Sequence, residues 1–209
     1  MFNFDDVENF DRHISVSIPA YDVLTRAILG LSQYWVRNGS VIYDLGCTTG
    51  KHLNMMKKVD GVEYIGIDKS SLLPDSNDFV TFINKNIVDV EYKEADLFLS
   101  IFTLQFLTRQ ERNKTIEIIK NKLKSGGALI VAEKNYFSDG FIQSAIDSVH
   151  KEIKSDNFSW TEIMGKEEQL RENMKPLRET ELIIELEKIG TVHEFWRTFG
   201  FSAYVVLKK

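Results

Sequence analysis

The sequence predicts an α/β domain with a mostly parallel sheet and helices on both faces. Two observations lead to this. Short apolar, β-branched segments alternate with helical segments through residues 40–135, and two further strand-like segments end the chain. Strand–helix–strand units give parallel sheets that are covered on both sides. The closing pair adds antiparallel strands, so we expect seven strands in one domain over residues 1–209.

The elements of the core sheet follow in order after an N-terminal helical segment, residues 1–38. Apolar residues recur at helical spacing from Ala20 to Val36, Pro19 stands near the helix start, and Asn38-Gly39 ends it. Helices are also expected over 51–58 and after Thr108, where Thr108 and Glu111 fit a capping box. Buried strands are predicted at 40–45, 63–68, 79–83, 95–101 and 128–132.

The remainder is predicted to be a helical insertion and a strand pair. Residues 138–189 form the insertion, with helix from residue 139 and a break near 157–159. The segments 192–196 and 201–207, within residues 191–208, have the strand pattern and are joined by a turn around 198–200.

Composition and charge exclude several classes of protein. The 209 residues are 43% hydrophobic and 27% charged, which is ordinary for a globular protein and excludes a mainly disordered chain. The net charge of −5 argues against a dedicated nucleic-acid coat, and a solvated helix face explains the lysines of 120–124. An acidic N-terminus and the absence of a long apolar run predict a cytoplasmic protein with no membrane contact.

A glycine turn and a distant acid carry the chemistry. The turn Asp44-Leu45-Gly46-Cys47-Thr48-Thr49-Gly50 follows the first strand, and Asp68 ends the second, 22 positions after Gly46. Glycines allow close backbone approach to a ligand, and an acid at this distance accepts hydrogen bonds from ribose hydroxyls. The pattern lacks the G-x-G-x-x-G of dinucleotide folds. It therefore suits a nucleoside without phosphates, such as S-adenosyl-L-methionine (SAM), although the glycine turn alone is also compatible with a plain strand-to-helix turn.

Asn86-Ile87 follows the third strand, where a polar and an apolar side chain can clamp adenine; Asn86 serves equally well as a turn residue. Cys47 is expected to supply a small side chain and a backbone N–H rather than a nucleophile. His150 could lie on the substrate side, but a histidine on a helix face is more often structural. Neither the four histidines nor the single cysteine can form a metal site.

Several motifs resemble the carboxy-S-adenosyl-methionine synthase family, of which the chain is identified as a divergent member. The resemblance covers nearly the whole chain after about Phe10 and rests on these strings: Ser17-Ile18-Pro19-Ala20-Tyr21, Tyr43-Asp44-Leu45-Gly46-Cys47, Phe102-Thr103-Leu104-Gln105-Phe106-Leu107, residues 126–134, Glu172-Asn173-Met174 and Val205-Val206-Leu207-Lys208. It implies a Rossmann-like class I methyltransferase fold. It also implies a cytoplasmic homodimer that converts SAM and prephenate into carboxy-SAM and phenylpyruvate, in support of wobble-uridine modification in tRNA.

The resemblance also implies site residues but assigns no catalytic acid or base. The residues expected to hold SAM, carboxy-SAM or S-adenosylhomocysteine are Tyr21, Gly46, Cys47, Thr48, Asp68, Lys69, Asn86, Ile87 and Ile101. Prephenate is a dianion, so cations are expected near it. The candidates are Arg171, Lys166, Lys134 and Arg178.

Three positions depart from the family pattern. The family has an acid at Asn86, an asparagine at Ile101, and a carboxylate-binding arginine where this chain aligns Glu167. Arg171, one helical turn later, could reach the same space. The departures keep two alternatives open: an ordinary methyltransferase with an unknown acceptor, and a catalytically silent SAM-binding subunit that stabilises a partner.

Overall fold

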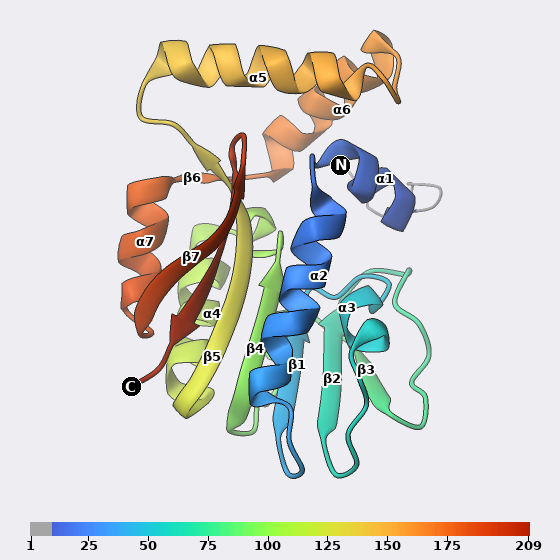
Figure 1. Ribbon diagram of the computed structural model, residues 1–209, viewed down its shortest axis with the longest axis vertical. Coiled ribbons are helices and arrows are strands. Elements are labelled where there is room, and N and C mark those ends of the chain that lie inside the picture. Colours follow the sequence, from blue (N-terminus) through green and yellow to red (C-terminus); the bar gives the residue numbers. More distant parts are fainter. Residues whose placement is uncertain (1–9) are drawn as a thin grey trace.

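A computed structural model describes residues 10–209; the first nine residues of the predicted N-terminal segment lie outside it. One sheet runs through the molecule in the order β3-β2-β1-β4-β5-β8-β7 (Figure 1). The pairs among β1 to β5 are parallel, and β8 pairs antiparallel with both β5 and β7. The strands are β1 (Val41–Leu45), β2 (Glu63–Asp68), β3 (Val80–Asn84), β4 (Ala95–Ile101), β5 (Leu123–Tyr136), β6 (Leu177–Arg178), β7 (Thr191–Thr198) and β8 (Phe201–Leu207). The predicted seven-stranded class I arrangement is confirmed, with β6 as a short addition that pairs with β5.

Helices cover both faces of the sheet. Alternate residues of a strand point to opposite faces, and in β1 Tyr43 and Ile42 therefore belong to two different apolar clusters. The cluster with Tyr43 packs against α4 and α7, and the cluster with Ile42 packs against α2 and α3. The helices are α1 (Phe10–Ser17), α2 (Tyr21–Ser32), α3 (Lys51–Met55), α4 (Arg109–Lys122), α5 (Gly140–Lys154), α6 (Trp160–Asn173) and α7 (Glu179–Glu187), with short 3-10 turns η2 (Gln33–Trp35), η3 (Ile87–Asp89) and η4 (Leu104–Phe106).

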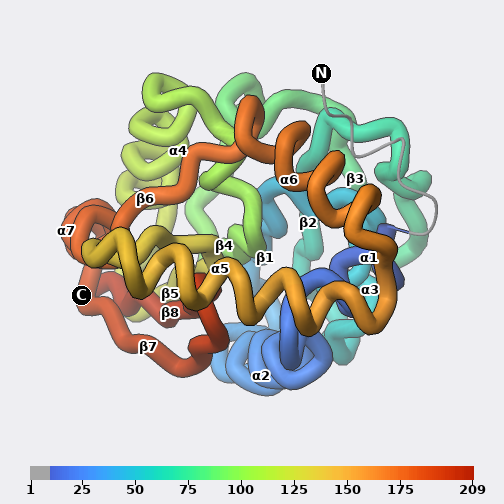
Figure 2. The backbone as a smooth tube through the Cα atoms, turned by 90° about the horizontal axis from the view of Figure 1, so that it is seen from above, coloured from blue at the N-terminus to red at the C-terminus, as the bar shows by residue number. Residues whose placement is uncertain are grey.

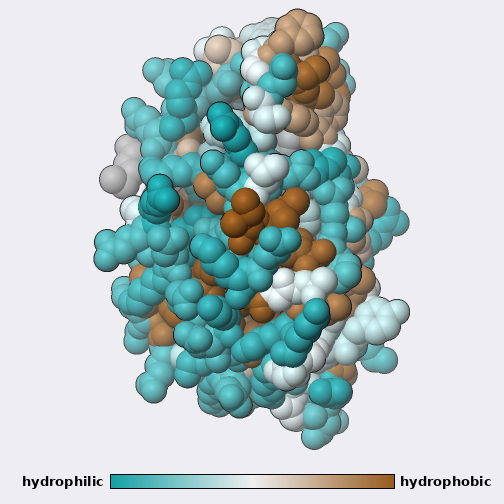
Figure 3. Space-filling model, turned by 90° about the vertical axis from the view of Figure 1, so that its left-hand side faces the viewer, coloured by the Kyte–Doolittle hydropathy of each residue, from teal (hydrophilic) through white to brown (hydrophobic). Residues whose placement is uncertain are grey.

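Helices α5 and α6 form a roof across the carboxyl ends of the parallel strands (Figures 1 and 2). The Asp139 side chain caps α5, and Ser159 with Glu162 forms a capping box at the start of α6, so the predicted break near 157–159 is confirmed. The outer surface of α5 exposes apolar side chains, among them Phe141, which is 79% exposed. Figure 3 shows apolar atoms gathered at the top of this side of the molecule.

The insertion differs from the prediction in one respect. Helix does not continue from α6 to residue 189, because the chain leaves the helix at Met174, forms β6 and starts again as α7. Pro176 explains this interruption, since proline has no N–H to donate and disfavours helical geometry in the residue before it. The capping box predicted at Thr108 is present at the start of α4.

Two other boundaries differ. The expected turn at 125–127 lies inside β5, where the pairing register with β4 shifts and Gly126 adopts a φ of +76°. The helix predicted to reach residue 58 ends as α3 at Met55.

No single helix within residues 10–209 is long and apolar enough to cross a membrane. The segments Phe10–Ser17 and Tyr21–Trp35 reach the required length only together, with a bend of 107° between them.

Candidate functional site

A cavity of about 1070 Å³ lies between the roof and the carboxyl ends of the parallel strands. Its floor consists of the segments that follow β1, β2, β3 and β4. This is the edge of an open α/β sheet at which ligands bind. The sequence-predicted residues that line the cavity are Tyr21, Gly46, Cys47, Thr48, Asp68, Lys69, Asn86, Ile87, Ile101, Lys134, Lys166 and Arg171.

The glycine turn places backbone atoms, with no side chain over them, at the floor of the cavity. Gly46 has a φ of +72°, and a Cβ there would lie 2.4 Å from Thr103 Cγ2. The Thr103 hydroxyl donates to the Leu45 carbonyl at 2.8 Å, so this side chain is held in place. At Gly66 in β2, a Cβ would lie 2.8 Å from Cys47 Sγ. Larger residues at Gly46 and Gly66 would therefore displace the turn.

Asp68 ties the glycine turn to the end of β2. Its Oδ2 accepts from the Thr48 backbone N–H at 2.8 Å, and its Oδ1 accepts from the Ser70 N–H at 2.9 Å. The Thr48 hydroxyl also donates to Oδ2, at 3.4 Å. A carboxylate has about four lone-pair sites, so these three bonds leave capacity for a ligand hydroxyl. Lys69 is exposed beside it and lines the cavity.

The carboxyl group of Asp44 lies at the floor of the cavity. It is 1% exposed, and its Oδ2 has no hydrogen-bond partner among the described residues. Burial, together with the charge of Asp68, raises the pKa of Asp44 to about 8. The nearest cationic candidate is His52, with Nδ1 4.0 Å from Oδ2, but burial lowers the pKa of His52 to about 4 and keeps it neutral. A buried carboxyl oxygen without a partner suits an ammonium group of a ligand.

Asn86 has partners of its own. Its Oδ1 accepts from the Val88 N–H at 3.3 Å and caps η3, and its Nδ2 donates to Glu111 Oε1 at 3.0 Å. The turn role is thus present in the structure. Ile87 beside it is 5% exposed and offers an apolar surface to the cavity.

An aromatic wall crosses the site from floor to roof. The ring centroids of Tyr21 and Phe102 are 6.4 Å apart, those of Phe102 and Phe201 are 5.8 Å apart, and those of Phe201 and His150 are 5.4 Å apart. His150 Nε2 lies 2.9 Å from the Ser17 carbonyl, which fixes Nε2 as the donor. Burial lowers the pKa of His150 to about 4, so this histidine is neutral near pH 7.

Cations gather in the upper half of the cavity, although the chain is acidic overall. They come from β5 and the roof and are Lys134, Lys151, Lys154, Lys166 and Arg171. The Lys134 ammonium lies 6.0 Å from the centre of the Phe201 ring. Burial and the neighbouring Lys134 charge lower the pKa of Lys154. The described residues place no acid in an ion pair with Lys134 or Lys154, so both can meet an anion.

Glu167, where the family resemblance implies a carboxylate-binding arginine, forms an ion pair within the roof. The Lys151 ammonium lies 2.7 Å from Glu167 Oε2. This ion pair offsets the repulsion that Glu167 would exert on a carboxylate ligand.

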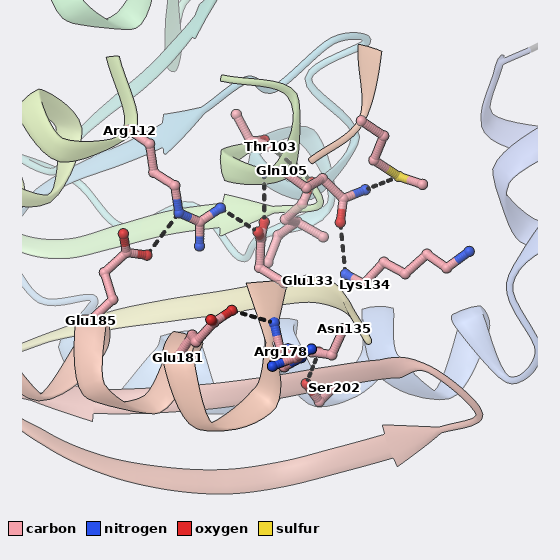
Figure 4. A network of polar contacts seen from close by, with 12 residues as sticks. Thr103, Gln105, Arg112, Glu133, Lys134, Asn135, Arg178, Glu181, Glu185 and Ser202 are labelled. Carbon is pink, nitrogen blue, oxygen red and sulfur yellow. Dashed lines mark hydrogen bonds and ion pairs between the residues drawn. The ribbon is translucent and has the colours of Figure 1, made fainter. Parts of the chain in front are cut away.

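Of the four sequence-predicted cations, only Arg178 lies outside the cavity. Arg178 does not line the cavity; it is exposed, and its backbone N–H donates to Glu181 Oε2 at 3.0 Å at the start of α7. Arg178 ends β6, which pairs with the end of β5, and Figure 4 shows it beside Glu181 at the start of α7. Burial raises the pKa of the Cys47 thiol, which argues against a nucleophile. No group of three metal-ligating side chains occurs in residues 10–209.

The structure adds cavity residues that the sequence did not single out. Lys51 lies 4.8 Å from the centre of the Tyr21 ring, Lys151 and Lys154 project from α5, and Gln105 lines the cavity from η4. The helical pattern of 139–154 could have shown that Lys151 and Lys154 share a face, but not that this face lies over the sheet.

Known proteins share this fold and sequence pattern. Residues 43–131 match the family described as a methyltransferase domain. A carboxy-S-adenosyl-L-methionine synthase of Shewanella halifaxensis is 32% identical over 99% of this chain and 93% of its own, and one of Staphylococcus epidermidis is 29% identical over 87% and 83%. Among solved structures, the plantazolicin methyltransferase BpumL has a TM-score of 0.66 at 14% identity, covering 94% of this chain and 87% of its own. Human N-acetylserotonin methyltransferase has a TM-score of 0.59 at 15% identity, covering 90% and 52%.

The two solved structures establish the shared fold, and the sequence relatives extend over almost the entire chain. The protein is therefore a member of the carboxy-S-adenosyl-L-methionine synthase family, within the class I SAM-dependent transferases.

Proposed function

We propose that this protein uses SAM and prephenate to form carboxy-SAM and phenylpyruvate. The observation that carries the proposal is the division of a single cavity into two chemically different halves. The floor offers glycine backbone and an unpartnered acid, and the upper half presents cations beside an aromatic wall. A charged nucleoside suits the floor, and a dianion with an apolar ring suits the upper half.

The floor residues fit SAM. The open backbone at Gly46, with Cys47 and Thr48, would hold the methionine portion, and Asp44 would receive its ammonium. SAM, when bound, supplies an activated carbon attached to a sulfonium.

The rest of the cofactor fits the neighbouring segments. Asp68 and Lys69 would face the ribose, Asn86 and Ile87 the adenine. Tyr21 and Ile101 complete the walls around the same volume.

The upper half supports recognition of a dicarboxylate. Lys134, Lys154 and Arg171 approach the cavity from three different elements, so they can bind two separated carboxylates. Charge-assisted hydrogen bonds of this kind are about twice as strong as neutral ones. Arg171 projects from the helix that also carries Glu167, and the Lys151–Glu167 ion pair leaves Arg171 available for the ligand.

The proposal extends to the biological setting that the family resemblance implies. A single SAM-binding domain, residues 1–209, would work as a cytoplasmic homodimer, and its product would feed the modification of wobble uridine by a separate enzyme. The exposed apolar side chains on α5 support contact with a second copy.

A turnover assay tests the reaction. The purified protein is incubated with SAM and prephenate, phenylpyruvate is followed by absorbance, and carboxy-SAM is identified by mass spectrometry. An enzyme-free reaction corrects for spontaneous decay of prephenate. The proposal predicts equal amounts of both products. Formation of S-adenosylhomocysteine with an added acceptor would favour an ordinary methyltransferase, and binding of SAM without turnover would favour a silent subunit.

A further inference from the structure

The string Phe102–Leu107 is the most distinctive motif of the sequence, and the cofactor site does not account for its glutamine. Gln105 lies in η4, close to the end of the roof helix α6, and is 4% exposed. Its side-chain Oε1 accepts from the Lys134 backbone N–H at 2.7 Å, and its Nε2 donates to Met174 Sδ at 3.3 Å. Its backbone carbonyl accepts from the Lys175 N–H at 2.6 Å. Figure 4 shows this side chain between β5 and the methionine sulfur.

These contacts join two elements that carry candidate cations. Lys134 belongs to β5, and its side chain lines the cavity. Met174 is the C-cap of α6, and Arg171 occupies the last turn of that helix. Arg171 precedes Met174 by three residues, so an anchor at Met174 limits where the last turn of α6, with Arg171, can lie. A single glutamine thus connects β5, which carries Lys134, with the end of α6, which carries Arg171.

A buried charge network holds Gln105 from the opposite side. The Gln105 backbone N–H donates to Glu133 Oε1 at 3.4 Å. Arg112 of α4 donates from Nη1 to Glu133 at 2.9 Å and from Nε to Glu185 of α7 at 2.8 Å (Figure 4). Arg112 is 5% exposed and Glu133 is 1% exposed, so breaking this network would leave buried charges unpaired. Gln105 is therefore anchored to the rigid core of the sheet.

We propose that Gln105 is a positioning residue that sets the spacing between Lys134 and Arg171 for the anionic co-substrate. This inference rests on the proposed function of the upper half of the cavity. The glutamine does not itself touch the reacting atoms. It joins the end of α6 to the Arg112 network through hydrogen bonds. Lys134 and Arg171 are therefore already in place before the ligand binds, and less conformational entropy is lost on binding.

The test compares three variants by steady-state kinetics, SAM binding and hydrogen exchange. Gln105→Met removes both side-chain hydrogen bonds with little change in volume, and Met174→Leu removes the sulfur acceptor alone. Gln169→Met makes the same chemical change at an exposed position of α6 and serves as the control. With two modest hydrogen bonds lost, we expect Gln105→Met to raise KM for prephenate about ten-fold, with kcat within about two-fold and the Kd for SAM unchanged. Met174→Leu should raise KM by about three-fold, and the control should not change it.

Amide hydrogen exchange measures how firmly the Gln105 hydrogen bonds hold the end of α6, and it needs no co-substrate. We expect faster exchange over residues 170–177 in Gln105→Met and in Met174→Leu, but not in Gln169→Met. A folded Gln105→Met protein with unchanged KM and unchanged exchange would overturn the inference, as would a loss of kcat at constant KM. If the unmodified protein does not turn over prephenate, the proposed reaction fails and the exchange result alone decides the role of Gln105. If Gln105→Met does not fold, Met174→Leu provides the same decision.

Discussion

The floor and the roof of the cavity are built in different ways. The floor takes its form from backbone at the ends of parallel strands, where Gly46 and Asp68 are fixed by the register of β1 and β2. The roof contributes side chains from two helices that return to the sheet through β6. The floor therefore depends on conformations that few residue types can adopt, whereas the roof contributes charged side chains at the ends of long, flexible stems. The cavity is lined by several cations although Glu167 stands where the resemblance implies an arginine.

The largest expected effect comes from Gly46→Ala. The added Cβ would meet Thr103 at 2.4 Å in a backbone with a φ of +72°, so the turn must move. We expect SAM affinity to fall by about 100-fold, since strain of this kind is worth 1–3 kcal/mol and the ligand contacts are lost as well. Isothermal titration with SAM measures the change.

Gly30→Ala is the matched control, because a Cβ at Gly30 meets nothing within 4 Å. Unchanged affinity in folded Gly46→Ala would show that the glycine turn is not part of the cofactor site.

A second effect concerns the pH dependence of stability. Burial raises the pKa of Asp44 from 3.8 to about 8, so the folded protein holds this proton more tightly than the unfolded chain does. The stabilisation is complete below pH 3.8 and is lost as the pH rises through about 8. We expect the free energy of unfolding of the ligand-free protein to fall by about 2 kcal/mol between pH 6 and pH 8 through this group.

Urea unfolding at both pH values checks this expectation. The loss should be smaller in Asp44→Asn, and the exposed substitution Asp75→Asn should leave it unchanged. Identical losses in all three proteins would place the ionisation of Asp44 in its ordinary range.

A smaller effect is expected at the roof side of the cavity. Lys134→Met removes one cation but keeps the backbone N–H of residue 134, which donates to Gln105 Oε1. We expect about a ten-fold increase in KM for prephenate at unchanged SAM affinity, because one charge-assisted hydrogen bond is lost. Steady-state kinetics measure it, with the exposed substitution Lys114→Met as the control. A loss of SAM affinity with constant KM would assign Lys134 to the floor instead.

The smallest effect is expected at Cys47. Its thiol is buried and its pKa is raised by burial and by Asp44, so it stays protonated at neutral pH. We expect Cys47→Ala to retain activity within about three-fold, since a small apolar residue preserves the turn. A turnover assay decides, and a loss of two or more orders of magnitude would make the sulfur a participant in the reaction.

Sequence patterns point to the floor residues more directly than to the roof residues, for physical reasons. Gly46 and Asp68 can be recognised in the sequence. A turn with a positive φ favours glycine, and a ribose-binding carboxylate stands at the end of a strand at a characteristic spacing from that turn. Lys154 and Lys151 gave no such signal, since lysines on a helix face are usually solvated and only the placement of α5 over the sheet makes them part of a cavity. Arg178, a predicted cation of the site, does not line the cavity, because the interruption at Pro176 turns the chain back to β5. The partners of Asn86 lie in η3 and α4, which local pattern could not connect.

The most direct test of the two-part site is the identity of the small molecule that the protein carries. The protein is purified without added ligand and denatured, and the released compound is analysed by mass spectrometry. We expect a SAM derivative heavier by one carboxyl group, held jointly by the floor and the cations above it. Release of unmodified SAM or S-adenosylhomocysteine alone, from protein that also fails to consume prephenate, would contradict it.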